Sequence, residues 1–217
     1  MDASEVFARL EFPPGRRAVS VSDAEGAYLY DLVRRTGASR TVECGLGLGA
    51  SAACILAASS GRHVVADPNQ RASDSPGLAN LTRLGLDDRV EFHQTASHVM
   101  LAQLASQGRT IDFAFVDGRH LYDYILVDFF LIDQILERGG HIVLHDAWLR
   151  STSLVAAFIA RNRRDYRRVH SGHRNLVVFQ KVGEDTRAWH HIREFCTWRG
   201  LLSQRLGMLL VRWRGYR

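Results

Sequence analysis

Several features are scarce in this sequence, and each scarcity excludes a class of protein. The 217 residues include only four Pro, and no run approaches the about 20 consecutive apolar residues that a membrane-spanning helix needs. The low Pro content, the absence of a repetitive tract and an apolar fraction of 46% exclude a disordered, collagen-like or repeat protein. Length and composition therefore predict one globular domain, with short appendages at most.

Cysteine is also scarce, which bears on the cellular compartment. Cys44, Cys54 and Cys196 are odd in number, far apart, and without the C-x-x-C spacing of a zinc or redox site. Such cysteines indicate a reducing compartment. The first ten residues, MDASEVFARL, lack the basic stretch followed by an apolar stretch that marks a secretory signal. We therefore expect a cytoplasmic protein.

The net charge of +5 is confined to one end of the chain. Residues 187–217 carry seven Arg and one acidic residue, Glu194, which leaves 21 basic and 22 acidic side chains in residues 1–186. A uniformly cationic surface, which non-specific binding to phosphates requires, is therefore not predicted for the main body. Nucleic acid is accordingly not an expected partner of that body.

Apolar stretches rich in β-forming residues alternate with segments of helical period. The predicted strands cover residues 41–44, 63–66, 90–93, 111–116, 141–144, 167–170 and 176–180. A helix is predicted over 121–136, with Gly139 and Gly140 ending it. This alternation predicts an α/β fold of the Rossmann-like type. Its sheet is mostly parallel and seven-stranded, with helices on both faces and an antiparallel C-terminal hairpin.

Three parts of the chain follow from this pattern. Residues 1–37, helical from about residue 23, form a predicted N-terminal lid or dimer segment, and residues 38–183 form the main domain. Residues 184–217 form a basic amphipathic tail. Its apolar residues fall within an arc of roughly 80° on a helical wheel. They are Phe195, Trp198, Leu202, Leu206, Leu209 and Trp213. We expect the body or a second subunit of a homo-oligomer to cover this stripe, with peripheral contact to an anionic membrane as the alternative.

A glycine-rich loop directly follows the first predicted strand. Gly45, Gly47 and Gly49 let the backbone approach a ligand closely, and the helix that begins near Ser51 offers free N–H groups. The second predicted strand ends at Asp67, where a carboxylate would bind the two hydroxyls of a ribose. This strand–loop–helix–strand–acid pattern predicts a cofactor that contains adenosine.

Two classes of cofactor fit this loop. The spacing of Gly45, Gly47 and Ala50 is compatible with the dinucleotide fingerprint of NAD(P)-dependent oxidoreductases and flavin enzymes. Glu43, two residues before the first glycine, would repel a pyrophosphate, whereas it suits S-adenosylmethionine, which has an ammonium, a sulfonium and no phosphate. We favour S-adenosylmethionine and keep the oxidoreductase as the alternative enzyme.

At this loop the sequence resembles the class I S-adenosylmethionine-dependent methyltransferases. Their first motif, E/D-x-G-x-G-x-G, is matched by Glu43, Gly45, Gly47 and Gly49. With such a cofactor, we expect the methionine carboxylate at the loop and the ribose at Asp67. The adenine is expected at the end of strand 90–93, near Gln94, Thr95 and Ala96.

An acid and a histidine follow each of two further strands. Asp117 and His120 come after strand 111–116, and His145 and Asp146 come after strand 141–144. Ligands of open α/β sheets bind beyond the carboxyl ends of the strands, so we expect these four side chains to converge. Helix capping would explain the acids but not a histidine in both loops.

These segments resemble the small-molecule O-methyltransferase branch, of the methyltransferase domain 24 type, which includes antibiotic and macrolide-sugar O-methyltransferases. The resemblance rests on FVDGRHLY at 115–122 and RGGHIVLHD at 138–146, and it covers residues 38–150. It implies methyl transfer to a hydroxyl of a sugar, a phenol or another natural product. Ala147 departs from catechol-type relatives, which have Asn after the second acid.

The resemblance also implies roles for the residues of the two loops. In relatives that use a metal, residues at these positions hold Mg²⁺, which makes Asp117, His145 and Asp146 the implied ligands. His120 is the implied proton acceptor, and Asp117 is implied in catalysis and at the cofactor as well. The alternative outside enzymes is a catalytically silent protein that binds RNA or a membrane through its basic tail.

Overall fold

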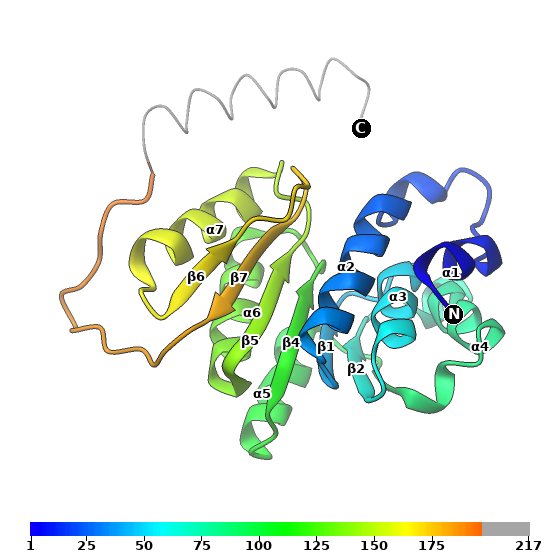
Figure 1. The fold of residues 1–217 in the computed structure, drawn as a ribbon, viewed down its shortest axis with the longest axis horizontal. Helices are drawn as coiled ribbons and strands as arrows, with labels where there is room; N and C mark the ends of the chain where they lie inside the picture. The colour runs from blue at the N-terminus through cyan, green and yellow to red at the C-terminus, as the bar shows by residue number, and fades with distance from the viewer. Residues whose placement is uncertain (197–217) are drawn as a thin grey trace.

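The computed structural model describes residues 1–196. A seven-stranded sheet in the order β3-β2-β1-β4-β5-β7-β6 forms its centre (Figure 1). The strands are β1 (Arg40–Cys44), β2 (Arg62–Ala66), β3 (Val90–His93), β4 (Ile111–Val116), β5 (Leu136–Leu144), β6 (Tyr166–Val169) and β7 (Val177–Lys181). β1 to β5 pair in parallel, and β7 runs antiparallel to both β5 and β6. The predicted α/β fold with its C-terminal hairpin is confirmed.

Helices cover both faces of the sheet. They are α1 (Ala3–Arg9), α2 (Asp23–Thr36), α3 (Ala50–Ala58), α4 (Pro76–Arg83), α5 (Ser97–Ser106), α6 (Tyr122–Ile135) and α7 (Arg150–Asn162). Short 3₁₀ turns lie at η1 (Arg17–Val19), η2 (Arg71–Ser73) and η3 (Asp87–Arg89). No helix among residues 1–196 is long and apolar enough to cross a membrane.

The hydrophobic core has two halves, one on each face of the sheet. In β4, Phe113 and Phe115 pack with buried residues of α1 to α4, whereas Ala114 and Val116 pack with α5, α6 and α7. Alternate residues of a strand point to opposite faces, so a strand that is apolar throughout is buried on both sides. Val6 of α1 is fully buried in the first half of the core. The N-terminal segment therefore packs on its own sheet.

One boundary differs from the prediction. The predicted helix over 121–136 is observed as α6, but β5 begins at once at Leu136 instead of after Gly140. Leu136 pairs with Ile111 of β4, and the register shifts between Ile111 and Phe113. A non-local pairing thus extends the strand through two glycines that the local pattern assigns to a turn.

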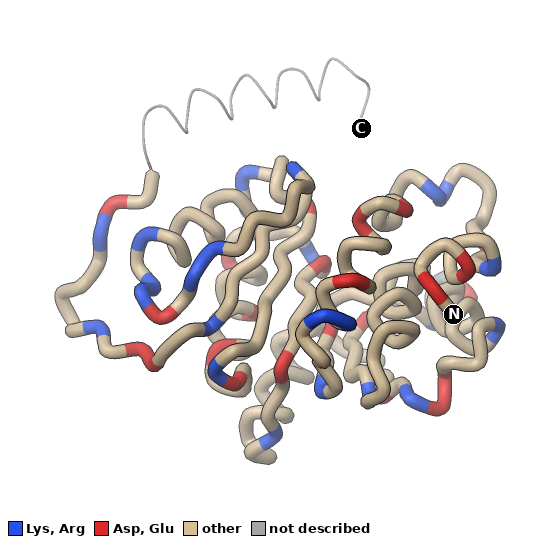
Figure 2. The backbone as a smooth tube through the Cα atoms, in the orientation of Figure 1, with Lys and Arg blue, Asp and Glu red and all other residues tan. Residues whose placement is uncertain are grey.

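The amphipathic stripe predicted for the tail lies largely outside the described residues. Of that stripe only Phe195 is described, and its ring stacks edge-on against Phe158 of α7. Trp198, Leu202, Leu206, Leu209 and Trp213 lie beyond the described part of the chain. Figure 2 shows both signs of charge distributed over the described backbone, as the near-neutral composition of the main body predicts.

Candidate active site

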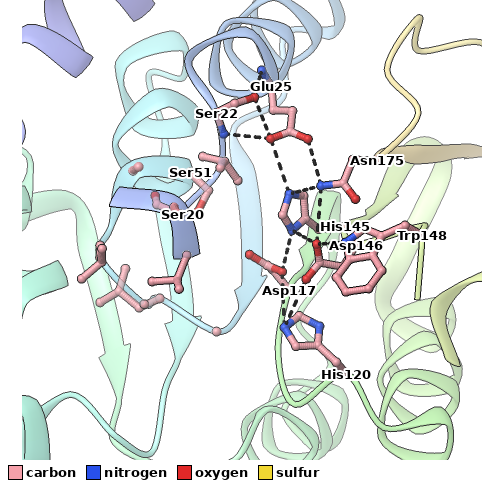
Figure 3. Close-up of a pocket in the computed structure, with 18 residues that line it drawn as sticks. Ser20, Ser22, Glu25, Ser51, Asp117, His120, His145, Asp146, Trp148 and Asn175 are labelled. Carbon is pink, nitrogen blue, oxygen red and sulfur yellow. Dashed lines mark hydrogen bonds and ion pairs between the residues drawn. The ribbon is translucent and has the colours of Figure 1, made fainter. Parts of the chain in front are cut away.

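A cavity of about 620 Å³ opens at the carboxyl ends of β1, β4 and β5, beside the start of α2 (Figure 3). Its walls come from five segments of the chain that are distant in sequence. The lining residues are Ala18, Val19, Ser20, Val21, Ser22, Glu25, Gly45, Leu46, Gly47, Leu48, Ala50, Ser51, Asp117, His120, His145, Asp146, Trp148 and Asn175. The glycine loop and the two acid–histidine loops therefore share one cavity, as the sequence predicts.

The glycine loop lies directly against the backbone at Asp117. Gly45 has φ +93°, and a Cβ built on it would lie 2.6 Å from the carbonyl oxygen of Asp117. The Asp117 N–H donates to the Cys44 carbonyl at 2.9 Å, so the ends of β1 and β4 are held in register. Only glycine allows this close approach, which places the loop beside the acid.

Asp67 holds the glycine loop in shape. The backbone N–H groups of Leu46 and Gly47 donate to its Oδ2 at 3.2 and 2.9 Å, and the Asn69 N–H donates to Oδ1 at 2.7 Å. The side chain is buried and lies outside the residues that line the cavity. Asp67 therefore acts on the cavity through the backbone of the loop.

Glu43 lies below the loop, inside the core. It is fully buried, the Ser51 hydroxyl donates to it, and His63 Nε2 lies 2.8 Å from its Oε2. Burial raises the pKa of Glu43, although the hydrogen bonds from His63 and Ser51 oppose the rise. Of this group, Ser51 lines the cavity. Glu43 thus supports the first turn of α3.

The residues predicted near the adenine lie at the end of β3 and outside the cavity lining. Gln94, Thr95 and Ala96 are partly buried, and Gln94 Nε2 donates to the Pro68 carbonyl at 2.6 Å. Gly49, the N-cap of α3, faces α4 instead, because a Cβ there would lie 2.7 Å from the Gly77 carbonyl. The structure therefore separates these four residues from the acid–histidine group.

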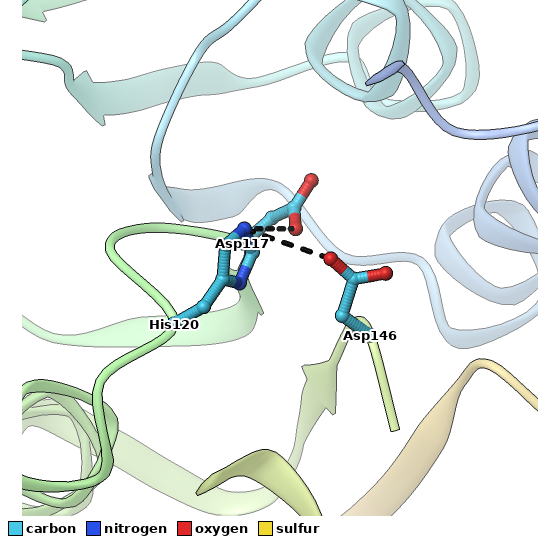
Figure 4. A group of neighbouring side chains, drawn as sticks. All are labelled: Asp117, His120 and Asp146. Carbon is cyan, nitrogen blue, oxygen red and sulfur yellow. Dashed lines mark ion pairs between the residues drawn. The ribbon is translucent and has the colours of Figure 1, made fainter. Parts of the chain in front are cut away.

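Asp117, His120 and Asp146 form a compact cluster on the cavity wall (Figure 4). One ligand atom from each lies within 4.8 Å of the others. His120 Nε2 lies 3.6 Å from Asp146 Oδ2 and 3.9 Å from Asp117 Oδ1. His120 and Asp146 also have positive φ, at 55° and 52°. Non-glycine residues rarely adopt this conformation, and it concentrates at functional sites.

His145 lies behind Asp117, away from this cluster. Its Nδ1 donates to Asp117 Oδ1 at 2.8 Å, and its Nε2 lies 3.7 Å from Glu25 Oε2. Burial alone would lower the pKa of His145, but hydrogen bonds to Asp117 and Glu25, with the charges of Asp117 and Asp146, raise it to about 10. Both ring nitrogens are engaged by neighbouring side chains, Nδ1 by Asp117 and Nε2 by Asn175, whose Nδ2 lies 3.0 Å away. The structure therefore groups His120 with the two acids, where the resemblance implied His145.

Burial also raises the pKa of Asp117, and the hydrogen bond from His145 offsets part of that rise. Burial by itself would raise the pKa of Glu25. The hydrogen bonds from His145, Ser22 and Asn175 outweigh it and lower the pKa of Glu25 well below its usual range. His145 is thus a buried cation between two carboxylates.

Of the cavity residues that were not predicted from the sequence, three contact His145 or Asp146 directly. Glu25 also completes a capping box with Ser22 at the start of α2, so its local pattern signals only a helix N-terminus. Asn175, in the connection between β6 and β7, donates to Glu25 Oε1 at 2.9 Å. Trp148, 48% exposed, donates from Nε1 to Asp146 Oδ1 at 3.0 Å. No local signal marks Asn175 or Trp148 as a site residue.

Residues 42–147 match the model of a protein family described as a methyltransferase domain. The matched stretch is 106 of the 217 residues. It contains the glycine loop, Asp67 and both acid–histidine pairs. The dinucleotide interpretation of the loop is accordingly set aside. No curated protein matches the chain.

Solved structures share the fold of this chain. The O-methyltransferase TomG from Streptomyces achromogenes, involved in tomaymycin synthesis and solved in complex with SAM, is 20% identical. That match covers 83% of this chain and 86% of that chain, with a TM-score of 0.67. An O-methyltransferase from Bacillus cereus in complex with SAH is 21% identical over 83% of this chain and 90% of that chain, with a TM-score of 0.64.

A methyltransferase from Geobacter sulfurreducens is 22% identical, covers 75% of this chain and 80% of that chain, and has a TM-score of 0.62. At these identities the likeness establishes the fold. The described part of the chain therefore has the Rossmann-like fold of these enzymes.

Proposed function

We propose that the protein is an S-adenosylmethionine-dependent O-methyltransferase that acts on a hydroxyl of a small molecule. The observation that carries this proposal is the position of Asp117, His120 and Asp146 on one wall of a cavity whose next wall is the glycine loop of a methyltransferase domain. A methyl donor at the loop and a hydroxyl at the cluster would lie in the same cavity. The cofactors named with the TomG and Bacillus cereus structures support the choice of donor.

The proposed cofactor residues fall into two groups: some line the cavity, and others lie behind the glycine loop and hold it in place. Gly45, Gly47 and Ser51 line the cavity and would lie along the methionine part of the cofactor. Asp67 and Glu43 would act from behind, by fixing the loop and the first turn of α3. We place the ribose at Asp67 and the adenine toward Gln94, Thr95 and Ala96, at the carboxyl ends of β2 and β3.

The chemistry requires alignment and removal of one proton. A sulfonium is already a good methyl donor, so the protein has to hold the acceptor oxygen in line with the methyl group and take its proton. His120 fits the second task, because its side chain is 38% exposed and lines the cavity. Within residues 1–196, the nearest partners of its Nε2 are the carboxylates of Asp146 and Asp117, at 3.6 and 3.9 Å. Asp117 and Asp146 would hold the hydroxyl and stabilise the imidazolium that forms.

The same cluster fits a divalent metal ion. Two carboxylates and one imidazole nitrogen within 4.8 Å provide three ligands, with Asp117, His120 and Asp146 as the residues that would hold the ion. A bound ion would lower the pKa of the acceptor hydroxyl and fix its direction. Mg²⁺ prefers an all-oxygen set, so the nitrogen donor favours a first-row transition ion such as Mn²⁺ over Mg²⁺. When such an ion is bound, another group must take the proton.

Calorimetry with S-adenosylmethionine tests the central proposal. We expect one molecule to bind per chain and NADH to give no heat. Asp67→Asn should weaken binding at least about tenfold, because an amide accepts the loop N–H groups less well than a carboxylate does. Asp74→Asn, an exposed acid in the connection that follows β2, is the matched control and should bind like wild type. Absence of binding by the wild-type protein would refute the proposed function.

The metal proposal needs its own measurement. We expect Mn²⁺ to bind the wild-type protein more tightly than Mg²⁺ does, and Asp146→Asn to lose most of the Mn²⁺ affinity. If the variant and the wild type bound Mn²⁺ with equal affinity, the proposed metal site would be refuted, while the proposal of methyl transfer would stand.

We also propose a compartment and an oligomeric state for the protein. Cys44 and Cys54 are buried free thiols and Cys196 is an exposed one, which supports a reducing compartment such as the cytoplasm. We propose a homo-oligomer, supported by the exposed apolar side chains of Val127 and Phe130 on α6. Contact of the basic tail with a membrane is the less favoured proposal.

A further inference from the structure

The cavity has an apolar rim that begins beside Asp146. Trp148 is 48% exposed and Val19, in η1, is 65% exposed, and both line the cavity. Leu46 and Leu48 of the glycine loop also contribute to its wall. Large apolar side chains that remain exposed on a concave surface are typical of ligand sites. The acceptor therefore presents an apolar surface to this rim.

Trp148 is fixed beside the acid that faces His120. Its Nε1 donates to Asp146 Oδ1 at 3.0 Å, while Oδ2 of the same carboxylate lies 3.6 Å from His120 Nε2 (Figure 3). A hydroxyl between Asp146 and His120 is therefore separated from the indole by a single carboxylate. The ring that carries such a hydroxyl lies within reach of the indole.

The charges beside this rim disfavour an anionic acceptor. Among residues 1–196, the cavity lining holds no Lys or Arg, its acids are Glu25, Asp117 and Asp146, and its His145 already pairs with Glu25 and Asp117. A carboxylate or phosphate on the acceptor would enter without a guanidinium or ammonium to pair with it, and it would meet like charges. The cavity suits an uncharged acceptor.

We propose that Trp148 determines acceptor specificity by stacking on the ring of an uncharged phenol whose hydroxyl lies between Asp146 and His120. This inference rests on the proposed function. Offset or edge-on stacking of two aromatic rings is attractive beyond the area it buries. A phenol also loses its proton near pH 10, far more easily than an aliphatic alcohol, so an imidazole is a sufficient base.

The transfer then balances without a further reactant. The phenol proton passes to His120, the oxygen forms a bond to the methyl carbon, and the methyl–sulfur bond breaks. Its electron pair stays on sulfur, which leaves as a neutral thioether. The products are an aryl methyl ether, the demethylated cofactor and one proton.

Binding measurements distinguish stacking by the Trp148 ring from the hydrogen bond that its Nε1 donates to Asp146. The protein is saturated with S-adenosylhomocysteine, which prevents turnover, and titrated calorimetrically with three probes in metal-free buffer, so that His120 and Asp146 are free to meet the hydroxyl. Catechol supplies an uncharged aromatic ring, cyclohexanediol the same hydroxyl pair without the aromatic face, and protocatechuate the catechol ring with a carboxylate. The variants are Trp148→Leu, Trp148→Phe and, as a matched control, Trp189→Leu, which changes a Trp that is 94% exposed and outside the cavity lining.

We expect the wild type to bind catechol about three- to tenfold more tightly than cyclohexanediol, and more tightly than protocatechuate. Trp148→Leu should abolish the preference for the aromatic ring, Trp148→Phe should keep most of it, and Trp189→Leu should leave it unchanged. A wild type without this preference would overturn the proposal. So would an equal loss in both Trp148 variants, which would show that only the indole N–H matters. Failure to bind S-adenosylhomocysteine would instead overturn the proposed function.

Discussion

At the scale of single residues, His120 and His145 have opposite properties although each follows a strand beside an acid. His145 is buried between Asp117 and Glu25, which keep it protonated, whereas His120 faces the cavity without a committed hydrogen bond. A side chain that is held as a cation cannot take a proton. His120 is therefore the residue to alter when proton removal is tested.

We predict that His120→Ala lowers kcat by about 100-fold or more while the affinity for S-adenosylmethionine stays within about twofold of wild type. The reason is that the imidazole acts on the acceptor proton and lies outside the glycine loop. Rates of S-adenosylhomocysteine formation give kcat, and calorimetry gives the affinity. His170→Ala, at an exposed histidine outside the cavity lining, is the control. An unchanged kcat would show that a group other than His120 takes the proton of the acceptor.

A second prediction concerns the charge on His145. Glu25→Gln removes one of the carboxylates that stabilise the imidazolium, so the pKa of His145 should fall below about 10. A raised pKa stabilises the folded state fully below the unfolded value near 6.5, and that stability is lost as the pH rises through about 10. The variant should therefore lose this contribution at a lower pH than wild type.

Titration of the His145 ring by NMR and urea unfolding across pH 6 to 10 measure the two effects. Glu5→Gln is the matched control, because Glu5 holds the same capping-box position in α1 but is exposed. If both variants titrate alike, Glu25 has only a capping role.

At the scale of secondary-structure elements, the glycine loop contains two glycines that both have positive φ but differ in the room available for a Cβ. Gly45 and Gly47 both have positive φ, but a Cβ on Gly45 would strike the backbone of Asp117, whereas a Cβ on Gly47 meets nothing within 4 Å. The sequence motif treats the two positions alike. The packing of β1 against β4 distinguishes them.

We expect Gly45→Ala to lower the free energy of unfolding by at least about 2 kcal/mol, because strain and a backbone clash add. Gly47→Ala should cost only about 1 kcal/mol from its positive φ, yet it should weaken S-adenosylmethionine binding, because the new methyl group enters the cavity. Urea unfolding and calorimetry on both variants test this. Equal loss of stability in the two would mean that the loop moves away from Asp117 in solution.

Element boundaries also show what local pattern can and cannot predict. Helix α6 was predicted to within a residue at each end, because its apolar residues recur at steps of three and four within one segment. The early start of β5 at Leu136 depends on its pairing with Ile111, about 25 residues earlier in the chain. A pairing at that distance leaves no trace in the local sequence.

At the scale of the whole molecule, the N-terminal segment and the sheet share one half of the hydrophobic core. Val6 of α1 is fully buried among residues of α2 and α3, and η1 and the start of α2 form one side of the cavity. The same segment that completes the core therefore carries Glu25 and Val19 to the site. Stability and acceptor binding are coupled through it.

We predict that Val6→Ala destabilises the fold by about 1–3 kcal/mol in a single unfolding transition, because it removes two buried methyl groups from the shared core. Val99→Ala, at a valine that is 39% exposed on α5, should change stability by less than about 0.5 kcal/mol. Urea unfolding followed by circular dichroism and by fluorescence checks both. A separate early transition in the Val6 variant would mark the N-terminal segment as an independent lid.

The sequence by itself determined the α/β class, the order of strands and helices, the glycine loop and the convergence of Asp117, His120, His145 and Asp146. These follow from periodicity, from backbone freedom at glycine and from the rule that parallel strands end at one edge, all of which act locally or by topology. Only the tertiary structure decided which histidine faces the cavity, and it alone brought Glu25, Asn175 and Trp148 to the site. The contacts that make these choices join residues up to 150 positions apart, and burial and charge at such distances depend on packing in three dimensions.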